Sequence, residues 1–186
     1  MSPVTLPLDE LSRLDQAIYD GVARTPTPGL DEGLRRVSDA ANKSVLWIAV
    51  AATLAALGGR RGRRAAVDGL ASIAVASAVV NLGVKQVARR GRPDRAGSEV
   101  VEDRHVRMPD STSFPSGHSA SAFAFAEGVS ATLPWLGIPL RLAAATVAYS
   151  RVHTGVHYPG DVVAGSLIGM TAGELTAWTS ARLRSS

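Results

Sequence analysis

The sequence predicts an all-α protein, a polytopic membrane bundle of five to six transmembrane helices with amphipathic helices at its N-terminus. Three observations favour this fold class. Five long apolar runs follow one another after residue 43, each with Arg or Lys beside it. The runs are rich in Ala, Gly and Ser, as closely packed membrane helices are. The cations cluster between apolar runs and aromatic residues are only 5% of the chain, so we expect a membrane and not a nucleic acid as the partner.

The N-terminal segment, residues 1–43, is the most polar part of the chain and carries twelve charged side chains. Apolar residues recur at helical spacing on both sides of the breaker TPTPG, from Leu8 to Val22 and from Leu30 to Ala41. This pattern predicts two short amphipathic helices that lie on the membrane surface and pack against the spans. The chain therefore divides into an amphipathic segment, 1–43, and a membrane domain, 44–186.

Each apolar run is a candidate membrane span. The first two runs are sixteen residues long, and a full span takes roughly 18–20 residues. Flanking Arg and Lys side chains can extend to the interface and make up the difference. Glu127 and Glu174 lie inside later runs, where a carboxylate needs a partner or a polar cavity. The five runs are Ser44–Gly59, Gly69–Val84, Gly117–Leu140, Leu142–Ser150 and Val162–Ala181.

Three polar clusters stand at the ends of these runs: KQVARRGRP after the second, FPSGHS at the start of the third, and SRVHTGVHYPGD between the fourth and fifth. If the runs are consecutive spans, an even number of crossings separates these loops, so they lie on the same side of the membrane. We therefore expect the clusters to form one site. Its candidate residues are Lys85, Arg92, Ser116, Gly117, His118, Arg151, His157 and Asp161.

The residue types in these clusters suit phosphoryl transfer. Lys85, Arg92 and Arg151 supply cations, and guanidinium groups bind phosphate oxygens in a bidentate manner. PSGH places free backbone N–H groups where the third run begins, and a helix N-terminus favours an anion. Two histidines suit a nucleophile and a general acid. An aspartate four residues after the second histidine can orient its imidazole.

Two other kinds of site are compatible with parts of the pattern. His153, His157 and Asp161 have the i, i+4, i+8 spacing of metal ligands on a helix, but Pro159 and Gly160 interrupt that helix and nearby cations would repel a metal ion. Ser116 could be the nucleophile of a serine hydrolase. FPSGH lacks the glycine that precedes the serine in a nucleophile elbow, however. The chain has no cysteine, which excludes a thiol nucleophile.

The three clusters together resemble the signature of the type 2 phosphatidic acid phosphatase (PAP2) superfamily. The matching segments are Lys85–x6–Arg92–Pro93, Pro115–Ser116–Gly117–His118 and Ser150–Arg151–x5–His157–x3–Asp161. Each segment alone is a weak pattern, but the three in order between apolar helices are specific. The match covers residues 85–161, and the surrounding helices resemble the family only in character.

The resemblance implies a role for each matching residue. His157 would attack phosphorus and form a phosphohistidine, oriented by Asp161, and His118 would protonate the leaving group and then activate water. The phosphate would be held by Lys85, Arg92, Ser116, Gly117 and Arg151. The resemblance implies no metal and no other cofactor. His153 and His105 match no position of the signature.

The resemblance also implies an integral membrane phosphatase that acts on a lipid phosphate, such as a polyprenyl phosphate or diphosphate or phosphatidic acid. Ala, Arg and Gly are abundant, which suggests a GC-rich bacterial genome. Together with the predicted spans, this predicts a multi-pass protein of a bacterial plasma membrane. Membrane members of the family commonly have three spans before the Lys–Arg cluster, whereas only two are evident here. Two alternatives remain: an oxidase of the vanadium haloperoxidase type, and a catalytically silent membrane scaffold.

Overall fold

The computed structural model describes residues 8–185, and every regular element within that range is helical, which confirms the predicted all-α class. The longer helices are α1 Leu8–Arg24, α2 Pro28–Ala40, α3 Val45–Leu57, α4 Gly59–Ala78, α6 Gly117–Ser130, α7 Gly137–His153 and α8 Pro159–Ser185. The shorter elements are η1 Asn42–Ser44, the π-helical turn η2 Val79–Val84, α5 Lys85–Val87, η3 Glu102–Arg104 and η4 Pro134–Leu136.

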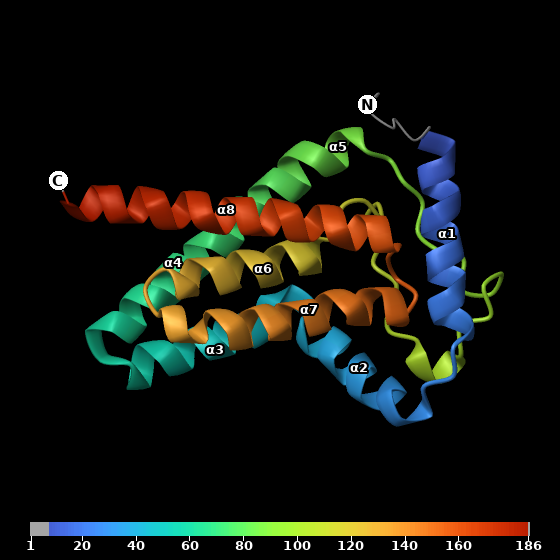
Figure 1. Ribbon diagram of the computed structural model, residues 1–186, viewed down its shortest axis with the longest axis horizontal. Coiled ribbons are helices and arrows are strands. Elements are labelled where there is room, and N and C mark those ends of the chain that lie inside the picture. Colours follow the sequence, from blue (N-terminus) through green and yellow to red (C-terminus); the bar gives the residue numbers. More distant parts are fainter. Residues whose placement is uncertain (1–7, 186) are drawn as a thin grey trace, which may run out of the picture.

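Helix α6 is the centre of the bundle and packs against α4, α7 and α8 (Figure 1). α6 and α8 begin, and α7 ends, at the end of the bundle that α1 crosses. Because the helices alternate in direction, the loops before α6 and before α8 meet at this end. The convergence expected from the order of the apolar runs is therefore present in the fold.

Small residues bring α6 and α8 into close contact. Gly165, Gly169 and Gly173 recur every four residues on α8, and a Cβ atom at any of them would clash with α6. The clashing atoms at the first two are backbone carbonyl oxygens, of Ser116 and Ala120. These three residues form a glycine seam on α8. Because no side chain projects from it toward α6, the two backbones approach closely, and close backbone packing is how helices associate in a lipid environment.

The third predicted run divides into two helices. Gly117–Leu140 was expected as one span, but α6 ends at Ser130 and α7 begins at Gly137, so the run contains a complete helix-to-helix connection. Pro134 opens the short η4 turn between them, and a proline cannot donate the backbone hydrogen bond that would continue α6. The fourth run, Leu142–Ser150, is consequently the middle of α7, which extends over 17 residues.

The second run belongs to a helix longer than its apolar part. The helical segment spans Gly59–Val87, 29 residues, so the basic sequence RRGRR forms its first turns instead of a loop. Near its end the helix widens into the π-helical turn Val79–Val84. Such turns rotate the residues that follow them and occur often at functional sites.

The two amphipathic helices form as predicted, and both contact the bundle. α1 touches α7 and α8, while α2 packs on α7. α2 and α3 meet at a bend of 65°. Lys43 and Ser44 at this bend have φ angles of 52° and 58°, in the left-handed region that residues other than glycine rarely adopt.

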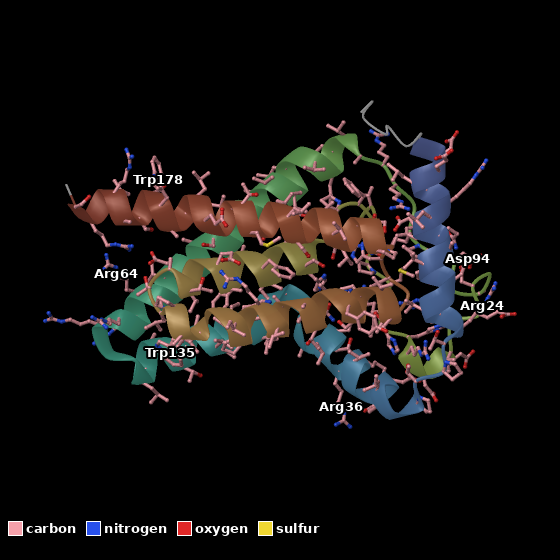
Figure 2. All side chains as sticks on the ribbon, in the orientation of Figure 1. Arg24, Arg36, Arg64, Asp94, Trp135 and Trp178 are labelled. Atoms are coloured by element: carbon pink, nitrogen blue, oxygen red, sulfur yellow. The ribbon has the colours of Figure 1, made fainter. Side chains whose placement is uncertain are left out.

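By length and composition, one helix of the described residues, Gly59–Val87, could cross a membrane, and the bent pair α2–α3 passes the same test as a unit. The five to six spans expected from the sequence therefore remain a prediction. Large apolar side chains are exposed on the outside of the bundle, including Leu82, Ile138 and Leu167. Trp135, Trp178 and Arg64 all lie toward the end of the bundle opposite α1 (Figure 2).

Two carboxylates inside the apolar helices, Glu127 and Asp68, are paired, whereas Glu174 is exposed on α8. Glu127 on α6 binds Arg141 of α7 through two hydrogen bonds. Asp68 on α4 pairs with Arg184 of α8 at 3.1 Å. Charges in a medium of low dielectric constant are stable when they are paired, so these residues have structural partners far from the polar clusters.

We expect Gly169→Leu to destabilise the fold, because the new side chain would push α8 away from the Ala120 carbonyl. Overpacking of this kind lowers the free energy of unfolding by about 3 kcal/mol. The measurement is the thermal midpoint of the detergent-solubilised protein, with Leu167→Met on the exposed face of the same helix as control. Equal midpoints for Gly169→Leu and the control would contradict the close packing of α6 and α8.

Candidate active site

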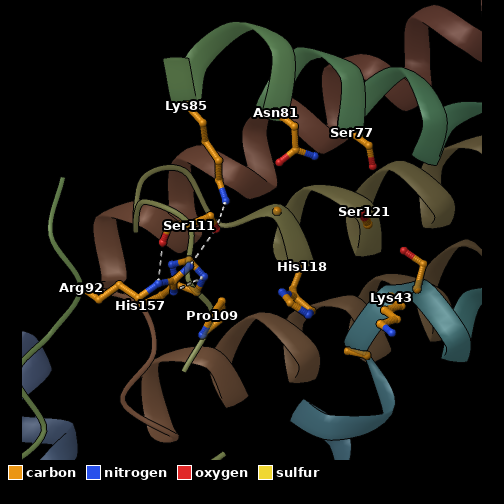
Figure 3. Close-up of a pocket in the computed structure, with 13 residues that line it drawn as sticks. Lys43, Ser77, Asn81, Lys85, Arg92, Pro109, Ser111, His118, Ser121 and His157 are labelled. Atoms are coloured by element: carbon orange, nitrogen blue, oxygen red, sulfur yellow. Dashed lines mark hydrogen bonds between the residues drawn. The ribbon is translucent and has the colours of Figure 1, made fainter. Parts of the chain in front are cut away.

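A cavity of about 200 Å³ lies where the polar clusters meet (Figure 3). It is large enough for a phosphorylated head group but not for a lipid chain. Its wall contains three cationic side chains and no carboxylate, so it favours an anion. The lining residues are Ala41, Lys43, Ser44, Ser77, Asn81, Lys85, Arg92, Pro109, Ser111, Gly117, His118, Ser121 and His157.

Lys85 and Arg92 are held on one side of the cavity by Ser111. The Lys85 ammonium donates to Ser111 Oγ at 3.0 Å, and Arg92 Nε donates to the Ser111 carbonyl at 2.9 Å. Arg92 Nη1 also donates to the Val156 carbonyl at 2.7 Å. The loop between the first two clusters thus closes over the site and fixes both cations. Ser111 carries no sequence signal that would have revealed this role.

His157 lies in the turn between α7 and α8 with both ring nitrogens in defined surroundings. Nε2 faces the cavity and is 3.3 Å from Arg92 Nη1. Nδ1 is 3.5 Å from Asp161 Oδ2 and equally far from Ser113 Oγ. Burial lowers the pKa of His157 to about 4, so the ring is neutral at pH 7. A neutral imidazole with Nε2 toward the cavity is a competent nucleophile.

Asp161 is fully buried behind His157 in the first turn of α8. Its Oδ2 accepts hydrogen bonds from Ser113 Oγ and from the Tyr158 backbone N–H, the latter at 2.9 Å. Its Oδ1 accepts from Arg90 Nη1 at 2.9 Å. The carboxylate is therefore fixed by three donors besides its approach to His157, as expected of a group that orients an imidazole.

Arg90 connects Asp161 to the amphipathic helix α1. Its Nη2 lies 2.6 Å from Asp15 Oδ2, and Asp15 in turn accepts from the Gly160 N–H at 2.6 Å. The guanidinium also stacks 4.1 Å above the ring of Tyr158. Arg90 belongs to the same basic cluster as Arg92, but nothing in the sequence distinguished it from its neighbour Arg89. Asp15, in a distant amphipathic helix, gave no signal at all.

His118 faces the cavity from the first turn of α6. Its Nε2 is 3.0 Å from Asn42 Oδ1 in the bend between α2 and α3, which leaves Nδ1 for proton transfer. A Cβ atom at the neighbouring Gly117 would make only an ordinary contact, 3.9 Å from Val80. Protein packing therefore does not require a glycine at position 117, and the open space at the helix N-terminus lies toward the cavity.

Ser116 and Arg151 are buried beside the cavity and are not among its lining residues. Ser116 is the N-cap of α6, and its Oγ accepts from the Ser119 N–H and hydroxyl. Arg151 donates through Nη1 to the carbonyl and hydroxyl of Ser38 on α2. Its Nε and Nη2 are buried without a partner among the described residues. Two unused donors on a buried guanidinium point to an anionic ligand.

The other two histidines have structural partners. His153 Nε2 binds Asp31 Oδ1 at 2.9 Å, and Asp31 also pairs with the buried Arg104 at 3.0 Å. His105 Nε2 is 3.1 Å from the Val100 carbonyl. Because His153 turns toward α2, the even spacing of His153, His157 and Asp161 does not gather these three side chains around one point.

The polar clusters, the helical bundle and the cation-lined cavity point to one family. The family model described as the PAP2 superfamily matches residues 65–185. The chain belongs to the PAP2 superfamily. The match spans the Lys–Arg cluster, PSGH and the His157–Asp161 turn, so the PAP2 resemblance seen in the sequence is confirmed.

Related PAP2 proteins include phosphatases of lipid-linked substrates. A decaprenylphosphoryl-5-phosphoribose phosphatase from Mycolicibacterium smegmatis is 39% identical over 140 residues, 74% of this chain and 72% of its own length. The protein of the same name from Mycobacterium tuberculosis is 35% identical over 150 residues, covering 80% of this chain and 79% of the relative. A lipid A 4'-phosphatase from Bacteroides thetaiotaomicron is 32% identical over 109 residues, 56% of this chain and 48% of the relative.

The fold is also that of solved PAP2 structures. The transmembrane PAP2-type phosphatidylglycerolphosphate phosphatase from Bacillus subtilis superposes with a TM-score of 0.72, covering 94% of this chain and 88% of that one at 23% identity. LpxE from Aquifex aeolicus gives a TM-score of 0.68 at 24% identity, with 95% and 98% covered. The chain therefore has the fold of a membrane protein.

The low pKa of His157 predicts an acid-sensitive fold. In the unfolded chain a histidine titrates near 6.5, so below that pH the unfolded state binds a proton that the folded state excludes until about pH 4. This contribution to stability is present above pH 6.5 and is lost as the pH falls to 4, about 3 kcal/mol in all. Thermal midpoints of the wild type at pH 7 and pH 4.5 should differ more than those of His157→Gln. Equal pH sensitivity of the two proteins would refute this interpretation.

Proposed function

We propose that the protein is an integral membrane phosphatase that hydrolyses a lipid phosphate through a phosphohistidine on His157. The observation that carries this proposal is the cavity itself: a neutral imidazole held by a buried carboxylate faces a space lined by Lys85 and Arg92, with His118 on another wall. Membership of the PAP2 superfamily supports phosphatase chemistry at these residues.

In the first step, Nε2 of His157 attacks phosphorus, and the P–N bond forms as the bond from phosphorus to the leaving oxygen breaks. His118, which takes up a second proton on Nδ1 when the anionic phosphate lies beside it, gives that proton to the leaving oxygen, and the dephosphorylated lipid leaves. Asp161 holds Nδ1–H and stabilises the charge that develops on the ring. In the second step, water attacks phosphorus, His118 takes the water proton, the P–N bond breaks and inorganic phosphate is released.

In this mechanism, cationic side chains balance the negative charge of the phosphoryl group. Lys85 and Arg92 line the cavity, and the two unused donors of Arg151 are buried close to it. The backbone N–H groups that begin α6 at Gly117 add a favourable dipole, while Ser116 acts through the cap that fixes this turn. Three fixed cations can stabilise the transition state without a metal ion, so we propose a metal-independent reaction.

The proposed substrate has an isoprenoid tail. The two mycobacterial relatives are named for a decaprenyl-linked phosphoribose, and a Sulfolobus acidocaldarius relative, 32% identical over 130 residues, is named an undecaprenyl-diphosphatase. An apolar groove of about 320 Å³ lies between α4 and α8, on the helical segment Gly59–Val87 that also carries Ser77, Asn81 and Lys85 of the cavity. This groove offers an apolar surface for the tail of a lipid.

The proposed location is a bacterial plasma membrane, with five to six membrane-crossing segments. The exposed apolar faces of the bundle support this, since they cost free energy in water and none in lipid. α1 lies across the end of the bundle that contains the site (Figure 1). That arrangement suits a helix in the plane of the interface, above the phosphate level of the bilayer.

The phosphohistidine can be trapped. We expect His157→Ala to lower phosphate release from farnesyl phosphate by at least about a thousandfold, and His118→Ala to slow both chemical steps. Acid-labile, alkali-stable phosphate should be found on the wild type quenched during turnover, but not on His157→Ala. Full activity in EDTA is expected. If quenched His157→Ala carried as much covalently bound phosphate as the wild type, His157 would not be the nucleophile.

Arg90 should act as a positioning residue through Asp161. Arg90→Gln removes the donor to Oδ1 and the link to Asp15, so we expect kcat to fall about tenfold or more with little change in KM. Arg90→Lys should recover part of kcat. Arg89→Gln, an exposed neighbouring cation, is the control. If Arg89→Gln and Arg90→Gln have the same kcat, Asp161 does not depend on Arg90.

A further inference from the structure

The bend between α2 and α3 forms part of the cavity wall. Its three residues, Asn42, Lys43 and Ser44, make up η1, and the last two line the cavity although they lie outside the family signature. Asn42 is bonded to His118, which ties the bend to the site. The two consecutive left-handed residues, Lys43 and Ser44, are not glycines, so the backbone has an unfavourable conformation at the point where it lines the cavity.

Lys43 is the third cation of the cavity and differs from the other two in its contacts. Lys85 and Arg92 are half-buried and hydrogen-bonded to Ser111, whereas Lys43 is exposed at the rim of the cavity and has no ion pair or hydrogen bond among the residues that the structure describes. Figure 3 shows Lys43 across His118 from Lys85 and Arg92. A phosphate bound between Lys85, Arg92 and His157 would therefore leave Lys43 free at the other side of the cavity.

The wall between the two positive regions is polar. Ser77 and Asn81 project from the helix that also bears Lys85, and Ser121 projects from α6 beyond His118 (Figure 3). Ser77, Asn81 and Lys85 are spaced four residues apart, and Ser121 follows His118 by three. Hydroxyl and amide groups in such a row suit a hydroxylated group such as a sugar, and not a hydrocarbon chain.

We infer that Lys43, Ser44 and the Ser77–Asn81–Ser121 wall form a second subsite, which binds a phosphodiester joined to the reacting phosphate through a sugar. The substrate class is thus a lipid-linked sugar phosphate with two separated anionic groups. This inference rests on the proposed function, because it places the reacting phosphate beside His157. A lipid with a single phosphate and no sugar would use only half of the cavity.

The test compares three substrates in detergent micelles: farnesylphosphoryl ribose 5-phosphate, farnesyl phosphate and farnesyl diphosphate. Lys43→Gln should lower kcat/KM for the ribose substrate about tenfold, the value of a hydrogen bond to a charged group. It should leave farnesyl phosphate unchanged, and Lys43→Arg should retain activity on both. Arg64→Gln, an exposed cation at the other end of α4, is the control and should change neither (Figure 2).

The variant Lys43→Gly tests whether a loss of activity comes from lost substrate binding or from a disturbed fold. Glycine accepts a φ of 52° without strain, so this variant should keep the thermal midpoint of the wild type while it loses activity on the ribose substrate as Lys43→Gln does. Equal losses on ribose substrate and farnesyl phosphate, or no loss on either, would overturn the subsite. If Lys43→Gln lowered kcat/KM for farnesyl diphosphate alone, the two anionic groups would not need to be separated by a sugar, and the proposed substrate class would be wrong.

The variant His157→Ala distinguishes this inference from the function on which it rests. If His157→Ala hydrolyses any of the three substrates at the wild-type rate, the proposed function itself fails. If His157→Ala is inactive on all three while Lys43→Gln discriminates between none of them, the mechanism stands and the second subsite is wrong.

Discussion

The contact between the beginnings of α6 and α8 is the constraint on which the site depends. The Ser116 N–H donates to the Asp161 carbonyl at 2.9 Å, so the turn that carries Gly117 and His118 is bonded directly to the turn that carries His157 and Asp161. The glycine seam of α8 makes this approach possible over the length of both helices. Two histidines that are 39 positions apart in the chain thereby face one small cavity. A side chain anywhere in that seam would separate the two halves of the chemistry.

Charge pairing distinguishes the ion pairs within the bundle from the cation-lined cavity. Most buried carboxylates are matched by a guanidinium: Glu127 by Arg141, Asp68 by Arg184 and Asp31 by Arg104. Such pairs offset the cost of placing a charge in a medium of low dielectric constant. The cavity is different, because its cations outnumber the carboxylates that face it. Arg151 retains two buried donors without a partner. Both features favour an anion in this space.

The amphipathic N-terminal segment takes part in the site and is more than a surface attachment. α1 supplies Asp15 to the Arg90–Asp161 pair, α2 supplies Ser38 to Arg151, and the bend after α2 supplies Asn42 to His118. Each contact reaches a residue of the signature or its immediate partner. The division at residue 43 therefore separates chain segments of different polarity, while the functional unit draws on both. A polar helix is suited to this task, because it can present charged groups to the site at the membrane interface.

The sequence by itself determined the helical class, the amphipathic N-terminal helices, the PAP2 family and the clusters that meet at one end of the bundle. These properties follow from local periodicity and from short motifs, and alternating helix direction brings the clusters together whatever the details of packing. Helix boundaries within apolar runs did not follow from composition, because Gly117–Leu140 contains a turn at Pro134 that is as apolar as the helices beside it.

Only the tertiary structure decided which polar residues support the signature. Arg90 and Arg89 are adjacent and chemically identical, and a single ion pair with the distant Asp15 distinguishes them. Ser111, Ser113 and Asn42 belong to segments without recognisable motifs, and their roles arise from contacts across 26 to 76 positions of the chain. Left-handed residues at the α2–α3 bend and the π-helical turn before Lys85 set the shape of the cavity. Both are backbone responses to packing, which sequence periodicity does not encode.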